Sequence, residues 1–404
     1  MLGRNAAFRT LWTARLVSYI GDGIATVALV LLVSRGRPAT AVGGLLLAEA
    51  IPGFLSPALG AVSDRRPDRR VLMIQCELGQ AVLYGAIAAW MPPYGGLLVL
   101  VGVATLFSRT FSAASKSTIP ALVARDELMS ANALINTVFN LQVALGPAIG
   151  GLLVAASGGS RTAIAIDAAS FAVSGLLMVG LPRVPRAAGD AVDGGLGSDV
   201  REGFGYIWRD PLLRALIGSM FTLIMFASVD NVAVVFLVRN VLGEGPFAFG
   251  AAMSAFGVGM IAGALGLVRR WSKVHPATVV LVSMLFTGAG NLLVGVSPVI
   301  GLVIVFMALA GVGNGLVLVG EDTLLQRHVP ERLLGRVVGA QAAAIFLGST
   351  IAYALGGLLV DATSPRTALV VSGIGVFVVT ALVWPVLSRA VANDRAAAAP
   401  PASE

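Results

Sequence analysis

The chain alternates between long apolar runs and short polar breaks. A helix needs about 20 predominantly apolar residues to cross the hydrocarbon core of a bilayer. Cutting at charge clusters and at breaks rich in proline and glycine gives runs of that length at residues 11–33, 41–62, 71–91, 95–115, 130–155, 161–181, 213–238, 247–268, 277–297, 299–320, 336–360 and 366–388. The pattern therefore predicts an all-α membrane protein of twelve transmembrane helices.

One polar interruption is longer than the others and lies at the centre of the chain. Residues 182–211 are rich in glycine, aspartate and arginine, and they read as a linker. We therefore predict an N-terminal six-helix half at 1–181, a cytoplasmic linker at 182–211, a C-terminal six-helix half at 212–389 and a disordered cytoplasmic tail at 390–404.

Short segments recur between the two halves at a nearly constant offset. Gly150-Gly151-Leu152-Leu153-Val154 returns as Gly356-Gly357-Leu358-Leu359-Val360, and Ala58-Leu59-Gly60 returns as Ala264-Leu265-Gly266. Both offsets are 206 (356 minus 150, and 266 minus 60). An even number of helices per half makes the two repeats parallel. Transporters with this symmetry bind solute near the bilayer midplane, in a central cavity between the halves, and expose it alternately.

Composition agrees with a lipid environment. Hydrophobic residues make up 57% of the chain and charged residues 12%, about half the charged share of a soluble protein. The net charge of +7 comes from basic residues clustered between apolar runs, with few aromatics among them, which argues against nucleic-acid binding. A single cysteine excludes an internal disulfide, and two histidines in separate polar segments indicate no metal site.

The basic residues also predict the orientation, because positive residues are retained on the cytoplasmic side. Alternate loops carry most of them, at Arg65, Arg66, Arg69, Arg70, Lys116, Arg125, Arg183, Arg186, Arg201, Arg209, Arg269, Arg270, Lys273, Arg327 and Arg332. The opposite loops carry fewer, at Arg35, Arg37, Arg161, Arg239 and Arg366. We therefore expect both termini to be cytoplasmic, in a plasma (inner) membrane. The first run has Arg4 and Arg9 before it and Arg15 near its start; it is too long for a signal peptide and reads as a retained helix.

Asp22 is the leading candidate for a functional group inside the membrane. Ionisable residues in transmembrane segments are costly and are functional candidates by default. Asp22 lies about eleven residues, or roughly 16 Å, into the first run, close to mid-membrane. It reads either as a carboxylate that binds a proton or cation, or as a buried structural hydrogen-bond acceptor beside Gly21 and Gly23.

Glu49 and Arg109 are the next candidates, in the second and fourth runs, and both are placed nearer to helix ends. Arg109 either takes part in coupling or extends toward the cytoplasm with only its stem in lipid. Four further acidic residues are predicted to lie within a turn or two of an interface, solvated or paired: Glu77, Asp167, Glu321 and Asp322.

Polar residues in two other runs complete the candidate site. Asp230 and Asn231 in the seventh run are the nearest counterpart of Asp22 in the second half. The fifth run carries amides at mostly fourfold spacing, at Asn132, Asn136, Asn140 and Gln142. That spacing places them on one helix face, which either lines the cavity or bonds to neighbouring helices.

The segment after the second run carries a recognisable motif. Gly60-Ala61-Val62-Ser63-Asp64-Arg65-Arg66-Pro67-Asp68-Arg69-Arg70 resembles the motif between helices 2 and 3 of the major facilitator superfamily, with Pro67-Asp68 where a lysine-glycine pair is more usual. The resemblance covers essentially the whole chain. It implies a secondary transporter with two six-helix halves around a central cavity.

Within this motif Asp64 is the predicted gate residue. It lies at the C-terminal end of its helix, where the helix dipole disfavours an anion, so it needs a partner elsewhere. Arg336, near the N-terminus of helix 11, offers a guanidinium on the same side of the membrane. We expect Asp64 to bridge the halves there and Gly60 to allow close helix packing. Alternatively, Arg65, Arg69 and Arg70 only fix the topology.

The fifth run contains Leu145-Gly146-Pro147-Ala148-Ile149-Gly150-Gly151, similar to the glycine-proline motif of exporters in this superfamily. Gln142 stands where that motif usually has a glycine. Pro147 removes a backbone donor and can kink the helix, while the glycines permit close contact with a neighbour. The motif indicates either a bias toward export or ordinary small-residue packing.

Together these features predict a secondary transporter that exports a small amphiphilic molecule, such as a drug, secondary metabolite or siderophore, in exchange for protons. We expect no cofactor other than the proton gradient, no enzymatic activity, and a monomer whose partners are its solute, protons and membrane lipids. Uptake by proton symport is the alternative, and a receptor or scaffold without transport is less favoured. The chain has no phosphate-binding loop for an ATP-driven pump.

Overall fold

The structure, a computed structural model, describes residues 2–184, 205–270 and 274–398. In that part of the chain, eleven helices are long and apolar enough to cross a membrane, and a shorter apolar helix covers Ala39–Leu55. Each predicted apolar run corresponds to a helix or to a broken run of helices. The chain is therefore a multi-span, all-helical membrane protein.

The helices of the first half are α1 (Ala6–Val33), α2 (Ala39–Ala50), the 3₁₀ segment η1 (Ile51–Leu55), α3 (Ser56–Arg65), α4 (Arg69–Trp90), α5 (Tyr94–Leu122), the 3₁₀ turn η2 (Arg125–Glu127), α6 (Leu128–Ser157) and α7 (Arg161–Met178). Those of the second half are α9 (Pro211–Ala227), α10 (Asp230–Phe236), the π-helical segment η3 (Leu237–Val241), α11 (Pro246–Arg270), α12 (Pro276–Val296), α13 (Ile300–His328), α14 (Glu331–Ala362) and α15 (Pro365–Ala398).

Large apolar side chains lie on the outer faces of these helices. Val82 is 71% exposed, Leu176 68% and Leu382 72%. Water would make so much exposed apolar surface unfavourable, whereas lipid tails are as apolar as these side chains. The exposed residues therefore agree with a chain that spans a membrane.

Two compact units make up the described chain. The first comprises residues 1–192 and 234–257, and the second comprises 193–233 and 258–404. The segment 234–257 thus packs with the first unit, although the sequence predicts it in the C-terminal half. Its contacts explain the difference: Ser254 Oγ accepts a hydrogen bond from the backbone N–H of Ala148, and Arg239 donates to Ser34 Oγ.

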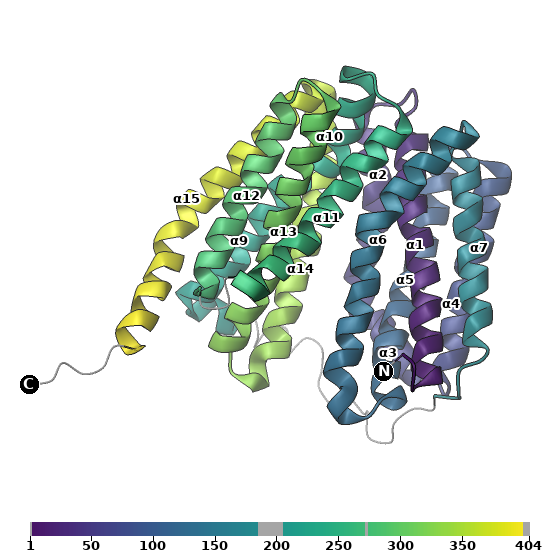
Figure 1. Cartoon of the computed structure of the whole chain (residues 1–404), viewed down its shortest axis with the longest axis horizontal. Coiled ribbons are helices and arrows are strands. Elements are labelled where there is room, and N and C mark those ends of the chain that lie inside the picture. The colour runs from purple at the N-terminus through teal and green to yellow at the C-terminus, as the bar shows by residue number, and fades with distance from the viewer. Residues whose placement is uncertain (1, 185–204, 271–273, 399–404) are drawn as a thin grey trace, which may run out of the picture. The chain divides into compact units, whose positions relative to one another are not determined.

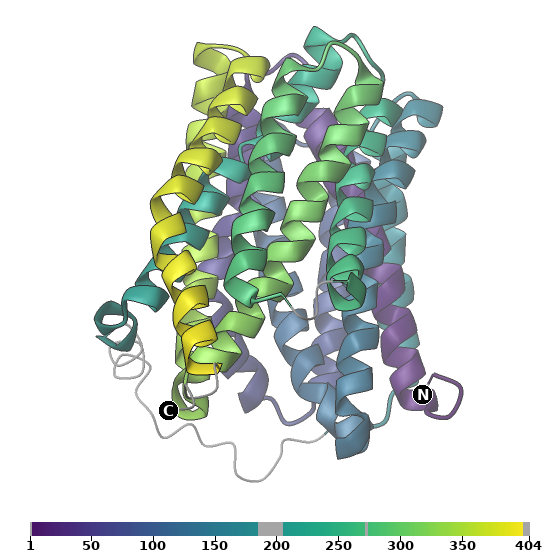
Figure 2. The ribbon, with the colours of Figure 1, turned by 60° about the vertical axis from the view of Figure 1, so that its left-hand side comes forward.

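The helix pairings of the first unit recur in the second. In the first unit α1 packs against α6 and α7, while α4 packs against α5 and α7 (Figure 1). In the second, α9 packs against α14 and α15, while α12 packs against α13 and α15 (Figure 2). Helices in the same order along each half therefore make the same contacts, as expected of two structural repeats.

Capping residues set several helix starts. The side chain of Asn5 accepts a hydrogen bond from the N–H of Phe8 at 2.9 Å and so caps α1. The helix therefore begins at Ala6, five residues before the predicted start at residue 11. Asp68 caps α4 by accepting from the N–H of Arg70 at 2.9 Å, and it also accepts from the N–H of Val184 at 3.3 Å. The unusual aspartate of the Pro67-Asp68 pair thus starts a helix and fixes the chain that follows α7.

Two predicted segments differ from the structure or lie outside it. Most of the predicted linker, residues 185–204, lies outside the described residues. The predicted disordered tail begins at residue 390, but α15 continues to Ala398. The sequence Ala390 to Ala398 holds five alanines and no proline or glycine, and alanine has the highest helix propensity.

Asp210 joins two helices of the second unit. Its Oδ1 caps α9 by accepting from the N–H groups of Leu212 and Leu213, at 2.8 and 3.2 Å, and its Oδ2 lies 2.8 Å from Nε2 of His328 in the last turn of α13. Burial raises the pKa of Asp210, but the bonds from His328 and the two backbone N–H groups outweigh that effect and hold the pKa below its usual value.

This arrangement predicts a pH-dependent contribution to stability. A lowered native pKa means that the Asp210 carboxylate stabilises the fold above its ordinary pKa, near 3.9, and that this contribution is lost as the pH falls through the native pKa. We expect Asp210→Ala to lower the free energy of unfolding by ~1 kcal/mol at pH 7. Asp210→Asn, which keeps a capping oxygen, should lose less. Thermal unfolding in detergent measures both, and equal melting at pH 7 for all three proteins would contradict the prediction.

Candidate functional site

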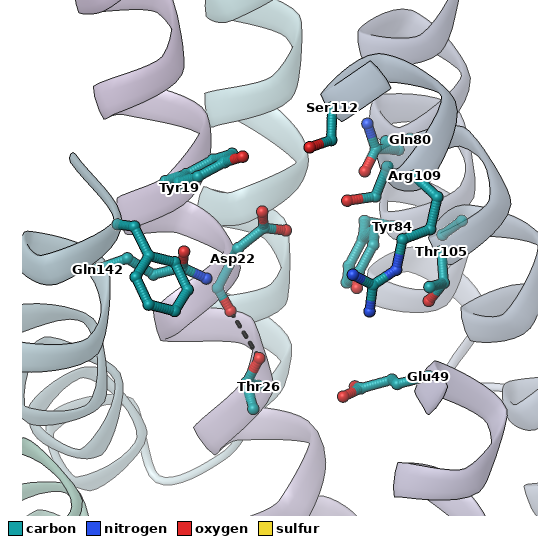
Figure 3. Close-up of a pocket in the computed structure, with 13 residues that line it drawn as sticks. Tyr19, Asp22, Thr26, Glu49, Gln80, Tyr84, Thr105, Arg109, Ser112 and Gln142 are labelled. Carbon is teal, nitrogen blue, oxygen red and sulfur yellow. Dashed lines mark hydrogen bonds between the residues drawn. The ribbon is translucent and has the colours of Figure 1, made fainter. Parts of the chain in front are cut away.

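A polar cavity lies within the first unit. Its volume is about 260 Å³. Five helices supply its lining, which consists of Tyr19, Asp22, Thr26, Glu49, Gln80, Tyr84, Ala104, Thr105, Ser108, Arg109, Ser112, Phe139 and Gln142 (Figure 3). Burying so many polar side chains inside a membrane-spanning bundle costs free energy, which makes these residues candidates for a functional site.

Three charged residues converge on this cavity. Asp22 comes from α1, Glu49 from α2 and Arg109 from α5, and Figure 3 shows their side chains pointing into the same space. The positive charge of Arg109 acts on both carboxyl groups. One arginine and two carboxyl groups inside a membrane can form one neutral ion pair, and the second carboxyl group is neutral only when it is protonated.

The structure corrects the predicted positions of Glu49 and Arg109 near helix ends. Because α5 runs from Tyr94 to Leu122, Arg109 lies at its middle, as Asp22 does in α1. Glu49 lies in the last turn of α2, but the chain continues through η1 into α3, so Glu49 is also central in its membrane crossing. The sequence predicts all three candidates, and the fold brings them together.

A helix break adjoins Glu49. The 3₁₀ segment η1 contains Pro52, which has no N–H for the helix ladder, and Gly53 follows it. A 3₁₀ stretch within a helix often marks a functional hinge. Glu49 therefore lies on the last regular turn before the break.

Several cavity residues were not predicted, although the sequence carries a signal for them. One face of α5 carries the predicted Arg109 together with Thr105, Ser108 and Ser112, which were not predicted. The intervals along this face are three, one and three residues. Such a polar stripe in an apolar helix marks a face turned away from lipid. On α4, Gln80 and Tyr84 are four residues apart and form a second stripe.

Arg15 does not line the cavity but contacts a residue of its wall. The sequence groups it with the basic N-terminus, but α1 begins at Ala6, and Arg15 is only 2% exposed. Its guanidinium donates to Ser115 Oγ at 3.1 Å and to the hydroxyl of Tyr19, and it lies 4.9 Å from the centre of the Tyr19 ring. Arg15 therefore holds a lining tyrosine in place.

Two acidic residues lie behind the cavity. Glu77 and Asp167 are predicted near an interface, solvated or paired, but both are 0% exposed. Ser18 Oγ of α1 donates to Glu77 Oε1 at 3.3 Å. Asp167 Oδ1 accepts from Ser170 Oγ at 3.2 Å and lies 2.4 Å from where a Cβ on Gly21 would be. Both carboxyl groups thus lie within about one helical turn of Asp22.

The amide face of the fifth run is only partly used. Gln142 of α6 lines the cavity, whereas Asn136 and Asn140 are not among the lining residues. Asn136 is exposed and Asn140 half-buried. The two readings of these asparagines, lining a cavity or bonding to neighbours, therefore stay open.

Asp230 and Asn231 form a separate pair in the second unit. The chain breaks between α9 and α10, and Asp230 starts α10, where the helix dipole favours an anion. Asn231 Nδ2 donates to Asp230 Oδ1 at 2.8 Å. Neither residue lines the cavity of the first unit. The hydrogen bond between them and the start of α10 at Asp230 indicate that these residues stabilise the break between α9 and α10.

The gate motif is only partly described. The side chains of Asp64 and Arg65 lie outside the described set, so the bridge from Asp64 to Arg336 stays a prediction. Arg69 donates to the carbonyl oxygen of Ser117 at 3.3 Å, and Arg70 to that of Leu181 at 2.7 Å. These two arginines thus tie α4 to α5 and to the end of α7.

Close packing at Gly60 is not found. No described atom lies within 4 Å of where a Cβ on Gly60 would be. The helix that carries Gly60 starts anew after η1, so its faces do not continue those of α2. Close helix approaches occur instead along α6.

The glycines of the fifth run pack against two helices. A Cβ on Gly146 would lie 2.6 Å from Cα of Gly23 in α1, and one on Gly150 would lie 2.7 Å from the carbonyl oxygen of Ile24. Gly151 faces α11, with Gly250 Cα 3.0 Å from its Cβ position. α6 continues through Pro147 to Ser157. Small residues therefore set the contact of α6 with α1, directly beside Asp22.

This contact gives a second stability prediction. A side chain at Gly146 would collide with the backbone of α1, which cannot rotate away, so we expect Gly146→Val to lower the free energy of unfolding by at least ~1–3 kcal/mol. Gly85→Ala is the matched control, because nothing lies within 4 Å of its Cβ position in α4. Thermal unfolding in detergent should show a lower melting temperature only for Gly146→Val. Equal melting of both variants would show that the close packing is absent.

The paired helices and the charged cavity inside the membrane define the chain as a transport protein of the major facilitator type. The family model described as transmembrane secretion effector (MFS_3) matches residues 3–402, and the chain belongs to this family. Such a transporter acts on a small-molecule substrate.

Relatives and solved structures agree with this assignment. The multidrug efflux pump Tap of Mycobacterium tuberculosis is 27% identical over 375 residues, which cover 89% of this chain and 88% of that protein. The enterobactin exporter EntS of Escherichia coli is 27% identical over 411 residues, covering 96% and 93%.

Two solved structures share the fold. The nucleoside transporter NupG matches with a TM-score of 0.71 at 13% identity, covering 94% of this chain and 98% of that one. A bacterial homologue of the human lysosomal transporter Spinster matches with a TM-score of 0.74 at 12% identity, covering 98% of both chains.

Proposed function

We propose that this protein exports a small amphiphilic molecule, such as a drug, secondary metabolite or siderophore, in exchange for protons. The observation that carries the proposal is the convergence of Asp22, Glu49 and Arg109 on one cavity within the first unit. The names of the relatives, a multidrug efflux pump and an enterobactin exporter, support the direction of transport and the substrate class.

The cavity suggests how protons and solute compete. Solute binding beside an ionised Asp22 displaces water from the carboxylate, and protonation of Asp22 removes the charge that holds a cationic or hydrogen-bonding solute. A proton entering from outside thus releases the solute there. Deprotonation toward the cytoplasm restores the binding form. No cofactor beyond the proton gradient enters this cycle.

The membrane setting follows the same proposal. The protein resides in the plasma (inner) membrane as a monomer. Both termini are cytoplasmic in this proposal, which the distribution of basic loops supports. Its surrounding partners are lipids, which the exposed apolar faces contact.

Everted membrane vesicles test the direction of transport. Vesicles from cells expressing the protein, with the interior acidified, should take up labelled antibiotics or catechol siderophores from a broad panel, and a protonophore should abolish that uptake. Vesicles without the protein are the control. Acid-driven uptake into right-side-out vesicles instead would favour the symport alternative. Proton-independent binding without uptake would favour a receptor.

A further inference from the structure

The second unit contains a cavity that Asp230, Asn231 and Arg336 do not line. Its volume is about 460 Å³, and it lies among the polar ends of α9, α12, α13 and α15. Arg327, His328, Arg389 and His275 line it, together with Asp210. Both histidines of the chain and two arginines therefore meet at one place.

The charge of this cavity is positive. Among the lining residues that the structure describes, Asp210 is the one acidic residue, and both of its oxygens are engaged, one with the N–H groups that start α9 and the other with His328. Among the side chains that the structure describes, neither Arg327 nor Arg389 has an ion-pair partner. α9 and α12 also begin here, and helix N-termini carry partial positive charge.

The cavity is also lined by apolar side chains. Leu212, Leu324 and Val386 contribute to its walls, and Leu324 is 5% exposed. A free inorganic anion would gain nothing from such walls, whereas an amphiphile would bury apolar groups against them. The walls therefore favour an occupant that carries both an anionic group and apolar parts.

The depth of the cavity indicates which amphiphile this is. Arg327 lies 27 residues from the start of α13 (327 minus 300), and Arg389 lies 24 residues from the start of α15 (389 minus 365). At 1.5 Å per residue these distances are about 40 and 36 Å, more than the ~30 Å hydrocarbon core. Trp208, 63% exposed beside Arg214, is a typical residue of the membrane–water interface. The cavity thus lies at the level of lipid headgroups.

We propose that this cavity binds the phosphate headgroup of an anionic phospholipid. Arg327 and Arg389 contact the phosphate, while the apolar walls receive the glycerol and the start of the acyl chains. Basic pockets between transmembrane helices bind anionic headgroups in this way. The bound lipid would join α13 to α15 at their polar ends and stabilise the second unit.

Lipid titration of the purified full-length protein in detergent tests the proposal. Phosphatidylglycerol, phosphatidylcholine and inorganic phosphate are added separately, and binding is followed by native mass spectrometry and by the melting temperature. We expect phosphatidylglycerol to bind and raise the melting temperature. Phosphatidylcholine and phosphate should do so weakly or not at all. Phosphate acting as strongly as phosphatidylglycerol would show a simple anion site, and phosphatidylcholine acting as strongly would show binding without charge recognition; either result overturns the proposal.

Variants assign the binding to the cavity. Arg327→Gln and Arg389→Gln should each weaken phosphatidylglycerol binding about fivefold, and Arg389→Lys should keep most of it. Arg332→Gln removes an exposed arginine that does not line the cavity and is the matched control. The melting temperatures without lipid show that each variant is folded. Unchanged binding in the double variant Arg327→Gln/Arg389→Gln, or an equal loss in Arg332→Gln, would contradict the proposal.

Discussion

Asp22→Asn should abolish accumulation of solute against its gradient, while exchange of solute for solute should persist at solute concentrations high enough to offset the weaker binding to the neutral amide. A pH difference of about two units supplies ~2.7 kcal/mol per proton, enough for roughly 100-fold accumulation with one proton per solute. The amide cannot take up or release that proton, so solute entering vesicles that carry the variant should only reach equal concentrations on both sides. Proteoliposomes with an imposed pH gradient measure both accumulation and exchange.

The controls separate loss of the proton site from loss of fold. Asp126→Asn makes the same chemical change in an exposed residue of η2, outside the cavity, and should transport as the unmodified protein does. Asp22→Glu keeps a carboxyl group and should keep part of the accumulation. Full gradient-driven accumulation by Asp22→Asn would exclude Asp22 from coupling and leave it as a structural acceptor.

Arg109→Gln should reduce both accumulation and exchange to less than about a tenth of the unmodified rates. Without the guanidinium, an ionised Asp22 or Glu49 has no positive charge nearby in the cavity, and an isolated charge at the centre of a membrane costs ~3 kcal/mol. Both carboxyl groups would then hold their protons, and neither could respond to solute. Transport rates in proteoliposomes with and without a pH gradient measure the effect.

Arg161→Gln is the matched control for this change, since Arg161 is exposed at the start of α7 and does not line the cavity. Arg109→Lys keeps the positive charge but loses the planar set of N–H donors. Its transport rates should therefore lie between those of Arg109→Gln and those of the unmodified protein. Solute exchange by Arg109→Gln at the normal rate would contradict this role. It would favour the alternative, in which Arg109 only extends toward the cytoplasm.

Much of the fold follows from the sequence because membrane helices need long apolar runs, and the runs are visible. Helix starts are less visible: Asn5 caps α1 before the apolar run begins, which is why Arg15 reads as a flanking residue although it is buried. The break at η1 also depends on local backbone geometry that Pro52 permits but does not dictate.

The candidate site is harder to predict, because it depends on how helices rotate about their axes. Asp22, Glu49 and Arg109 are recognisable as costly charges in apolar runs, yet nothing in a single run shows that three helices turn them toward one cavity. Glu77 and Asp167 show the same limit, since their burial depends on Ser18 and Gly21 of another helix. The polar stripe on α5 is the signal that periodicity does carry.

The most direct test of proton and solute competition is the number of protons released when a solute binds to purified protein in weak buffer, combined with the solute Kd at several pH values. For the unmodified protein we predict proton release on binding and a Kd that rises about 5- to 150-fold as the pH falls, and for Asp22→Asn we predict neither. A solute that binds the unmodified protein with the same Kd at every pH, and without releasing protons, would contradict the account.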